Sequence, residues 1–540
     1  MSNEQIIKDP DFEKLCKDVK KNVRYLNGTE LIAILKALLF LNVSANSSLC
    51  QNLLQMISKS VNKLTIAQTV FLTFLVKQCS SSPLVDALKI ATPVVFEAII
   101  RPQLDKENPD RVFQAFMFAF SESCISESTR EFLVDVALKI CDKFSTSQAH
   151  RMSVALCKVD QTSPSPEQVT LYKYLMDHVA DFMSNQLKIS EVNLLVGACI
   201  KAYTRKSELY FHEKFLENSM QCAVDYQASI LEIGNLLRNY SRVSYPCYKL
   251  IDYLDEKLAK HPDFEKVGSL EPFIGFLSSC SNCSYKPKFW LSYQERFVEL
   301  IDKNKTGPIP LIRVVTDLVV MKCWVSSLID YCFREEFLDS FLRREQNKID
   351  YLALLRLYQA VSTIYPGGYK HNLPSHNVIE EAKKIELDRA DFPLEGALSY
   401  AVGGYKYVLS GVSTRYGHFI DHVIVRQKSG KLTVINENEL KGNCRKTLES
   451  LEFPPESQMM GVLLLTPASY CLDGMKIRGN VRLKIHSLEA LGVAVIPVSR
   501  YGFMRLLDHE KIPYLANKIN SRTFAPNLSF QDETLIQLDQ

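Results

Sequence analysis

An internal repeat constrains the fold of this chain more than any other feature of its sequence. The segments GACIKAYTRKS (197–207) and GNLLRNYSRVS (234–244) align at a spacing of 37 residues, with Gly197 opposite Gly234. A looser third copy, GFLSSCSNCSY, begins at Gly275, 41 residues further on. A period of this length with two helices per unit is typical of an α-solenoid, in which each helix pair buries its apolar face against its neighbours. The repeat therefore predicts an extended, curved helical array, a shape suited to a linear ligand.

The texture of the sequence changes near residue 390. Before it, apolar residues recur every three or four positions, as in TELIAILKALLFLNV (29–43), which predicts helices throughout. After it, five short runs are typical of strands: YKYVLSGV, HFIDHVIVRQ, KLTVINEN (431–438), MGVLLLTP and GVAVIPVS. NVRLKIHSLEALG (480–492) is predicted to be a helix that ends at Gly492. A strand-helix-strand ending predicts a small α/β domain with a partly parallel sheet.

Composition places the chain among globular proteins. Hydrophobic residues make up 46% and charged residues 23%, and no apolar run reaches the roughly 18 to 20 residues needed to span a bilayer. We therefore expect no membrane span. The fifteen cysteines are scattered singly, without a second CxxC pair, so reduced thiols are expected.

Positive charge is concentrated near the C-terminus. The whole chain carries a net charge of +3, but residues 401–525 hold 17 Lys and Arg against 10 Asp and Glu, a net of +7. The last segment, 526–540, carries three acidic residues and no basic ones. Such an asymmetry indicates an anionic partner for the C-terminal domain, with nucleic acid as the first candidate.

The repeated segment carries two basic pairs. Lys201 with Arg205, and Arg238 with Arg242, each lie four positions apart on one helical face. In stacked repeats they are expected to form a ridge that binds RNA phosphates, with the tyrosine between each pair nearby to stack on bases. The alternative is that basic residues in a last helical turn complement the helix dipole.

One stretch, 417–442, resembles a metal-dependent nuclease centre in its residue types. Asp421 lies in a predicted strand, Glu437 is expected at the end of the next one, and Glu439 and Lys441 follow it. Nuclease centres hold Mg²⁺ or Mn²⁺ with carboxylates and use a lysine to orient water. The sequence thus predicts Asp421 and Glu439 as metal ligands, with Glu437 and Lys441 as further catalytic candidates. Two alternatives stay open: a polar hairpin exit, or a nuclease-like fold that contacts RNA without cleaving it.

Two further basic groups are predicted to contact RNA phosphates. One follows the predicted hairpin, and the other flanks the N-terminus of the 480–492 helix, where anions are favoured. They comprise Lys441, Arg445, Lys446, Lys476, Arg478, Arg482 and Lys484. A solvated charged face is the alternative interpretation.

Three segments, in order, carry a family resemblance. Residues 479–507 and 512–519 resemble the RAP domain, with a Lys- and Leu-bearing helix, LG, a strand ending in IP, an aromatic residue and a final YL at Tyr514-Leu515. LRLYQAVSTIYPGGYKHNLPS (355–375) and LLRNYSRVSYP (236–246) resemble the second and first FAST segments. The ordered set, over about 190–525, resembles FAST kinase domain-containing proteins. One departure is Arg500-Tyr501, where members often carry Glu-Trp.

The resemblance implies a function in mitochondrial RNA metabolism, meaning transcript stability, processing or translation in the matrix. It also implies a RAP domain similar in fold to PD-(D/E)xK nucleases. The acid-bearing N-terminus, MSNEQIIKDPDFEK, does not read as a mitochondrial presequence. Kinase activity is not expected, because the sequence lacks the GxGxxG, HRD and DFG motifs of phosphoryl transfer.

The predicted fold class is mainly α, an N-terminal α-solenoid of helical hairpins followed by a small C-terminal α/β domain. The predicted segments are 1–190 (helical repeats), 191–305 (first FAST-like), 306–390 (second FAST-like), 391–525 (RAP-like) and 526–540 (acidic tail). The predicted function is binding of single-stranded RNA, and the solenoid is the predicted surface for protein partners. Endoribonuclease activity and a protein-protein scaffold are the alternatives.

Overall fold

A computed structural model describes most of the chain. The described residues are 3–7, 9–159, 164–261, 269–307, 309–343, 348–386, 391–435, 447–451, 453–474 and 476–522. The chain divides into two compact units, Met1–Asp225 and Tyr226–Gln540, and each is described by itself.

The first unit is helical throughout its described part. Its helices are α1 (Asn3–Ile7), α2 (Pro10–Asn22), α3 (Gly28–Phe40), α4 (Ser48–Ser60), α5 (Ile66–Gln78), α6 (Pro83–Gln103), α7 (Pro109–Ser121), α8 (Glu127–Lys139), α9 (Thr146–Lys158), α10 (Pro166–Gln186), α11 (Ile189–Arg205) and α12 (Glu213–Asp225). Capping boxes at Asn27, Thr65, Ser145 and Ser165 begin four of them. Each box satisfies two backbone N–H groups that the helix start leaves without a partner.

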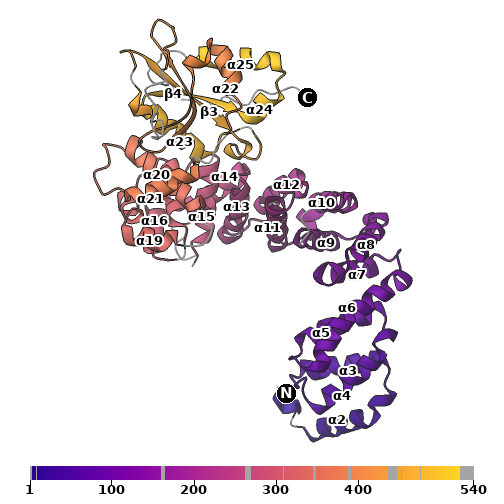
Figure 1. Cartoon of the computed structure of the whole chain (residues 1–540). Coiled ribbons are helices and arrows are strands. Elements are labelled where there is room, and N and C mark those ends of the chain that lie inside the picture. The colour runs from indigo at the N-terminus through magenta and orange to yellow at the C-terminus, as the bar shows by residue number, and fades with distance from the viewer. Residues whose placement is uncertain are drawn as a thin grey trace. The chain divides into compact units, whose positions relative to one another are not determined.

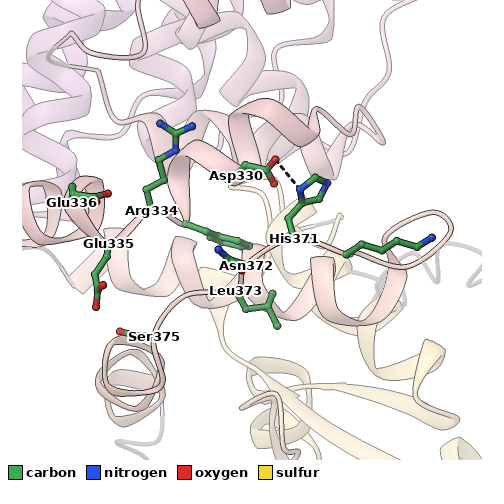
Figure 2. A pocket seen from close by; sticks show the side chains of 10 residues that line it. Asp330, Arg334, Glu335, Glu336, His371, Asn372, Leu373 and Ser375 are labelled. Carbon is green, nitrogen blue, oxygen red and sulfur yellow. Dashed lines mark ion pairs between the residues drawn. The ribbon is translucent and has the colours of Figure 1, made fainter.

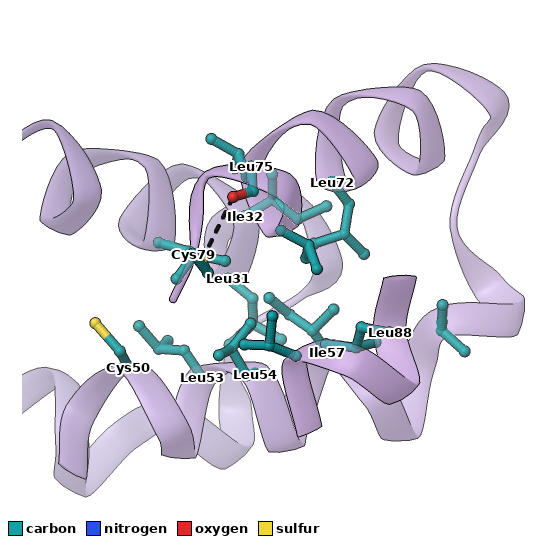
Figure 3. Close-up of a cluster of buried hydrophobic side chains, with 14 of the residues drawn as sticks. Leu31, Ile32, Cys50, Leu53, Leu54, Ile57, Leu72, Leu75, Cys79 and Leu88 are labelled. Atoms are coloured by element: carbon teal, nitrogen blue, oxygen red, sulfur yellow. Dashed lines mark hydrogen bonds between the residues drawn. The ribbon is translucent and has the colours of Figure 1, made fainter. Parts of the chain in front are cut away.

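A leucine-rich core holds the first helices of this unit together (Figure 3). Leu31 of α3, Leu53 and Leu54 of α4 and Leu72 of α5 are at most 2% exposed. They recur at helical spacing, so each helix buries one face against its neighbours. The pairing of successive helices is what the repeat period predicts.

The second unit begins with helices and ends with the α/β domain (Figure 1). Its helices are α13 (Ile230–Val243), α14 (Tyr248–Lys260), α15 (Glu271–Asn282), α16 (Trp290–Lys303), α17 (Leu311–Val320), α18 (Ser326–Cys332), α19 (Glu335–Leu342), α20 (Lys348–Ile364), α21 (His376–Glu386), α22 (Glu395–Val402), α23 (Gly479–Ala490), α24 (Arg500–Arg505) and α25 (Asp508–Ser521). The strands are β1 (Leu409–Ser413), β2 (Phe419–Arg426), β3 (Gln458–Leu465) and β4 (Val493–Ser499).

Two glycines of the repeat allow α13 and α15 to pack at close range. A Cβ on Gly234 would lie 2.1 Å from Pro272 Cβ, and one on Gly275 would lie 2.7 Å from the Gly234 carbonyl oxygen. Both distances are well inside van der Waals contact. The repeated glycine is therefore a packing residue between these two helices.

The same helices end in a common backbone turn. Ser244, Ser284 and Lys322, which follow α13, α15 and α17, have φ values of 52°, 48° and 60°. In each case the next residue donates its backbone N–H to a carbonyl five positions back, as Tyr285 does to Cys280 at 2.9 Å. This left-handed turn satisfies the last carbonyls of a helix. It extends the repeat to α17, where the sequence similarity is no longer visible.

The sheet has the order β1-β2-β3-β4, with antiparallel pairs up to β3 and a parallel pair between β3 and β4. Apolar residues fill both of its faces. Leu488 of α23 belongs to one core, and Leu398 of α22 with Leu515 of α25 belongs to the other. The sheet is thus covered by helices on both sides, as Figure 1 shows, and the mainly α architecture with a small α/β domain is confirmed.

One predicted strand is described only in part, and the described part is not a regular strand. The 431–438 segment contributes an isolated bridge, Leu432 to Arg426, and β2 takes its second partner from β3 instead. β1 occupies the first edge of β2 as far as Val423. Only the last residues of β2 are therefore left to pair with the segment after the turn, and the residues from 436 lie outside the described ones. The predicted helix is confirmed as α23, and Gly492 has the expected positive φ of 84°.

Within the described residues, none of the helices combines the length and apolarity that a bilayer span requires.

Candidate nucleic-acid interface

The α/β domain docks against the C-terminal ends of the repeat helices. α23 contacts α15, α17 and α20. We call this contact the seam, and it comprises 468–474 and 476–486 on one side and the turns 244–245, 281–286 and 319–324 on the other. Its polar links include the Leu472 N–H to the Ser244 carbonyl at 3.1 Å and Arg478 Nη2 to Asn282 Oδ1 at 3.3 Å.

Gly479 sets how closely the two sides approach. A Cβ at this first residue of α23 would lie 2.0 Å from the Ser281 carbonyl oxygen and 2.6 Å from Val320 Cγ1. A larger residue would force α23 away from α15 and α17. The glycine is therefore required by contact, at a φ that other residues also adopt.

The cations predicted around the α23 N-terminus have different surroundings. Lys476 Nζ lies 4.6 Å from the centre of the Tyr248 ring, a cation–π contact. Arg478 is half-buried and donates to the Ala468 carbonyl at 3.2 Å, so it holds the loop before α23. Arg482 is also half-buried and lines a pocket described below. Lys476 and Arg482 therefore lie where a ligand can reach them.

Lys484 instead belongs to a buried ion-pair network. Its Nζ lies 2.7 Å from Glu386 Oε1, and Arg356 Nη2 lies 2.7 Å from the same oxygen. The Lys484 and Glu386 side chains are 12% and 9% exposed. Burial acts to raise the pKa of Glu386, but Arg356 and Lys484 outweigh it and lower this pKa to about 2. Lys484 therefore joins the α/β domain to the repeats, and the Glu386 carboxylate compensates its positive charge.

A chain of buried hydroxyls and an imidazole lies beside this network. His418 is fully buried, with Nδ1 2.7 Å from Thr414 Oγ1 and Nε2 2.7 Å from Ser487 Oγ. Ser487 Oγ in turn donates to the Gln359 carbonyl at 3.2 Å. Burial and the nearby Lys484 lower the pKa of His418 to about 3, so the ring is neutral. The Ser–His pair is closed to substrate and serves to join β2, α23 and α20.

Asp421 lies inside the same region, with 3% of its surface exposed. Its Oδ2 accepts a 2.8 Å hydrogen bond from the Leu464 backbone N–H, across from β2 to β3. Glu437, Glu439 and Lys441 lie outside the described residues, as do Arg445 and Lys446. Among the described residues, no group of three potential metal ligands occurs. The metal centre stays a prediction. In the structure, Asp421 accepts a hydrogen bond that links β2 to β3.

The two basic pairs of the repeat fall in different units. Lys201 and Arg205 are exposed on α11 of the first unit. On α13 of the second unit, Arg238 pairs with Glu271, and Arg242 Nη1 lies 3.3 Å from Asn239 Oδ1. A continuous ridge across both units stays a prediction.

The tyrosines between the basic pairs differ in exposure. Tyr240 is fully buried and packs on Tyr245, with ring centres 5.6 Å apart, so it is a core residue. Tyr203 is half-buried and packs on Phe211. Base stacking by Tyr240 is therefore wrong, because its helix face is the one that packs inside the array.

A pocket of about 690 Å³ lies between α18–α19 and the 369–375 segment (Figure 2). Three carboxylates line it, from Asp330, Glu335 and Glu336. Asp330 accepts a hydrogen bond from the Tyr369 hydroxyl, and its Oδ2 lies 3.4 Å from His371 Nδ1. Arg334 and Lys370 line the pocket as well, but the carboxylates outnumber these two cations. The pocket is therefore a poorer phosphate site than one lined by cations without carboxylates.

A second pocket, of about 400 Å³, lies in the seam. It combines cationic and aromatic residues with an apolar floor, and no Asp or Glu is among its described lining residues. The cationic and aromatic members are Tyr285, Lys286, Lys322, Trp324, Arg482 and His486. Of these residues, the sequence patterns indicate Arg482 alone, because the others come from three separate segments. Among these others, only the Tyr285-Lys286 step, at the end of the third repeat copy, stands next to a sequence feature named above.

The fold and this site define a class: a helical repeat array with an α/β domain docked on it and a basic, aromatic pocket in the seam. No sequence model of a protein family matches the chain. The chain is similar to FAST kinase domain-containing protein 2, mitochondrial, of Homo sapiens, with 18% identity over 526 residues, which cover 95% of this chain and 68% of the relative. It is 25% identical to FAST kinase domain-containing protein 3, mitochondrial, of Homo sapiens, over 96% of this chain and 76% of the relative. FAST kinase domain-containing protein 2, mitochondrial, of Pongo abelii is 18% identical to the chain, over 95% of this chain and 70% of the relative. The resemblance to FAST kinase domain-containing proteins thus extends over nearly the whole chain.

Proposed function

We propose that this protein binds single-stranded RNA in mitochondria and acts in transcript stability, processing or translation. The observation that carries the proposal is the arrangement of cations and rings at the seam. Lys476 lies over Tyr248, whose ring centre is 5.2 Å from that of Tyr285, and the basic pocket begins at Tyr285. Rings next to cations are the groups that bind unpaired bases and the phosphates between them.

The relatives support this proposal in general terms. Their names place FAST kinase domain-containing proteins 2 and 3 in mitochondria. The motifs in residues 479–507 add the RAP-like assignment, and with it RNA as the ligand. Mitochondrial targeting of this chain is tested by protease protection of the tagged full-length protein in isolated organelles.

We infer contact rather than cleavage as the role of the α/β domain. Asp421 is buried and its Oδ2 bonds the Leu464 amide, which supports a structural use of this carboxylate. A nuclease-like resemblance of the domain is part of this proposal.

Fluorescence anisotropy with a labelled single-stranded RNA, over a series of salt concentrations, tests RNA binding. Each phosphate contact contributes a slope of about −0.7 to a plot of log affinity against log salt. Lys476→Glu is expected to weaken binding and to make the slope shallower. Lys428→Glu, the same charge change at an exposed position on the turn after β2, is the control. Affinity that does not depend on salt, or equal losses in both variants, would contradict the proposal.

A further inference from the structure

The seam pocket has the size and the enclosure of a small-ligand site. Its volume of about 400 Å³ lies within the roughly 300 to 1,000 Å³ of pockets that hold small molecules. It is bounded by the ends of α15 and α17, by Ile364 at the end of α20 and by the 479–486 part of α23. Gly479 lies in its wall, where even a Cβ would clash with Ser281 and Val320.

The charges around the pocket favour a phosphate. Lys286, Lys322 and Arg482 line it together with His486. Burial lowers the pKa of His486, and Arg482 and Lys322 lower it further, so these two cations lie close to the imidazole. The N-terminus of α23, which attracts anions, begins at Gly479 in the same wall.

The rings and the floor of the pocket favour an aromatic group. Trp324 is half-buried and held edge-on by Tyr365, with ring centres 5.3 Å apart. Tyr285 is fixed by a 2.6 Å hydrogen bond from its hydroxyl to Asp252 Oδ1. Met321 and Leu483 supply apolar surface beneath them. Rigid rings of this kind stack on bases, and each stacked base stabilises binding by about 1–3 kcal/mol.

We propose that the seam pocket binds a nucleotide that ends in a phosphate monoester, with the base against Trp324 and the phosphate among Lys286, Lys322 and Arg482. Three cations match a phosphate monoester better than a phosphodiester. The reason is charge, because a terminal phosphate carries about −1.5 to −2 near pH 7 whereas a phosphodiester carries −1. Two sources share this chemistry: the 5′-phosphorylated end of an RNA strand and a free nucleoside monophosphate. The first source rests on the proposed function.

A purely structural role for these cations makes a different prediction. Lys286 and Lys322 follow the C-terminal ends of α15 and α17, where positive charge also complements the helix dipole. In that case, their removal would lower the stability of the protein and leave nucleotide affinity unchanged.

The test uses the full chain and three ligands: AMP, a 5′-phosphorylated RNA oligonucleotide, and the same oligonucleotide with a 5′-hydroxyl. Tryptophan fluorescence reports the pocket, because the chain has two tryptophans and Trp290 is 1% exposed. We expect AMP to quench this fluorescence, and Trp324→Leu to abolish the quenching. We also expect the phosphorylated RNA to bind at least tenfold more tightly than the hydroxyl form.

Lys286→Gln and Lys322→Gln, both at exposed positions, are expected to reduce the preference for the phosphorylated RNA to less than threefold. Lys428→Gln is the matched control, and thermal unfolding verifies that each variant is folded. Salt-dependent RNA binding with no 5′-phosphate preference and no quenching by AMP would overturn the pocket and leave the proposed function standing. Quenching by AMP without RNA binding would overturn the proposed function and assign the pocket to free nucleotides. A preference that survives both lysine substitutions would overturn the assignment of the phosphate to these residues.

Discussion

Lys484 Nζ of α23 lies 2.7 Å from Glu386 Oε1 of α21, and this buried pair connects the α/β domain to the helical repeats. Arg356 of α20 contacts both oxygens of the same carboxylate, at 2.7 and 3.1 Å. The neighbouring helices α20 and α21 thus meet α23, 98 residues further along the chain, at one carboxylate. The relationship explains why a lysine predicted to contact RNA is instead a structural residue.

Removal of one member of this network should strongly destabilise the second unit. Lys484→Met leaves the Glu386 carboxylate buried with one cation fewer, and breaking a buried pair in this way costs about 3–5 kcal/mol. Chemical denaturation of the full chain measures the change. Lys428→Met, which breaks a pair to Glu456 in which both side chains are more than 70% exposed, should cost less than about 1 kcal/mol. Equal losses of unfolding free energy in the two variants would show that the buried network stabilises the protein no more than the exposed pair does.

Stability should fall on acidification through the titration of Glu386. Its folded pKa of about 2 lies below the roughly 4.3 of an unfolded glutamate. The contribution is therefore complete above about pH 4.3 and is lost as the pH falls toward 2, with a total of roughly 3 kcal/mol. The difference in unfolding free energy between the wild type and Glu386→Gln, measured at pH 6, 4 and 3, should shrink at each step. A constant difference would mean that Glu386 has an ordinary pKa.

Two glycine-to-alanine substitutions should have opposite effects. Gly234→Ala places a Cβ 2.1 Å from Pro272 Cβ and should destabilise the α13–α15 contact by about 1–3 kcal/mol or more. Gly396→Ala in α22 meets nothing within 4 Å and should be neutral or stabilising by up to about 1 kcal/mol, because alanine favours a helix. Thermal unfolding compares them. A neutral Gly234→Ala would contradict close packing as the reason for the repeated glycine.

Asp421 should behave as an acceptor inside the sheet. Asp421→Asn keeps an oxygen for the Leu464 N–H and should cost less than Asp421→Ala, which leaves that donor buried at about 1–3 kcal/mol. Denaturation of both variants measures the difference. Incubation of the same proteins with labelled RNA and Mg²⁺ or Mn²⁺ separates this role from metal binding. Metal-dependent cleavage that both folded variants lose would establish Asp421 as a ligand.

The sequence predicted the local features of this protein with considerable accuracy. A period of three or four along one chain segment is enough to indicate a helix, and the 37-residue spacing indicates how helices stack. β2, β3, β4 and α23 were predicted because each depends on neighbouring residues. The described part of the strand predicted after the 427–431 turn makes only an isolated bridge, since β1 occupies the edge of β2 as far as Val423. That choice is made by pairing rather than by composition.

The candidate site was only partly visible in the sequence. Arg482 stood out because it lies near a helix start, whereas Lys286, Lys322 and Trp324 had no motif around them. In the sequence alone Lys484 and Arg482 cannot be told apart in role, because both are basic and lie two residues apart on one helix. The sequence by itself determined that this chain forms helical repeats with a basic α/β domain at the end. Only the tertiary structure decided that Lys484 faces Glu386 and that Arg482 faces a pocket, because burial and pairing depend on which distant segments pack against each helix face.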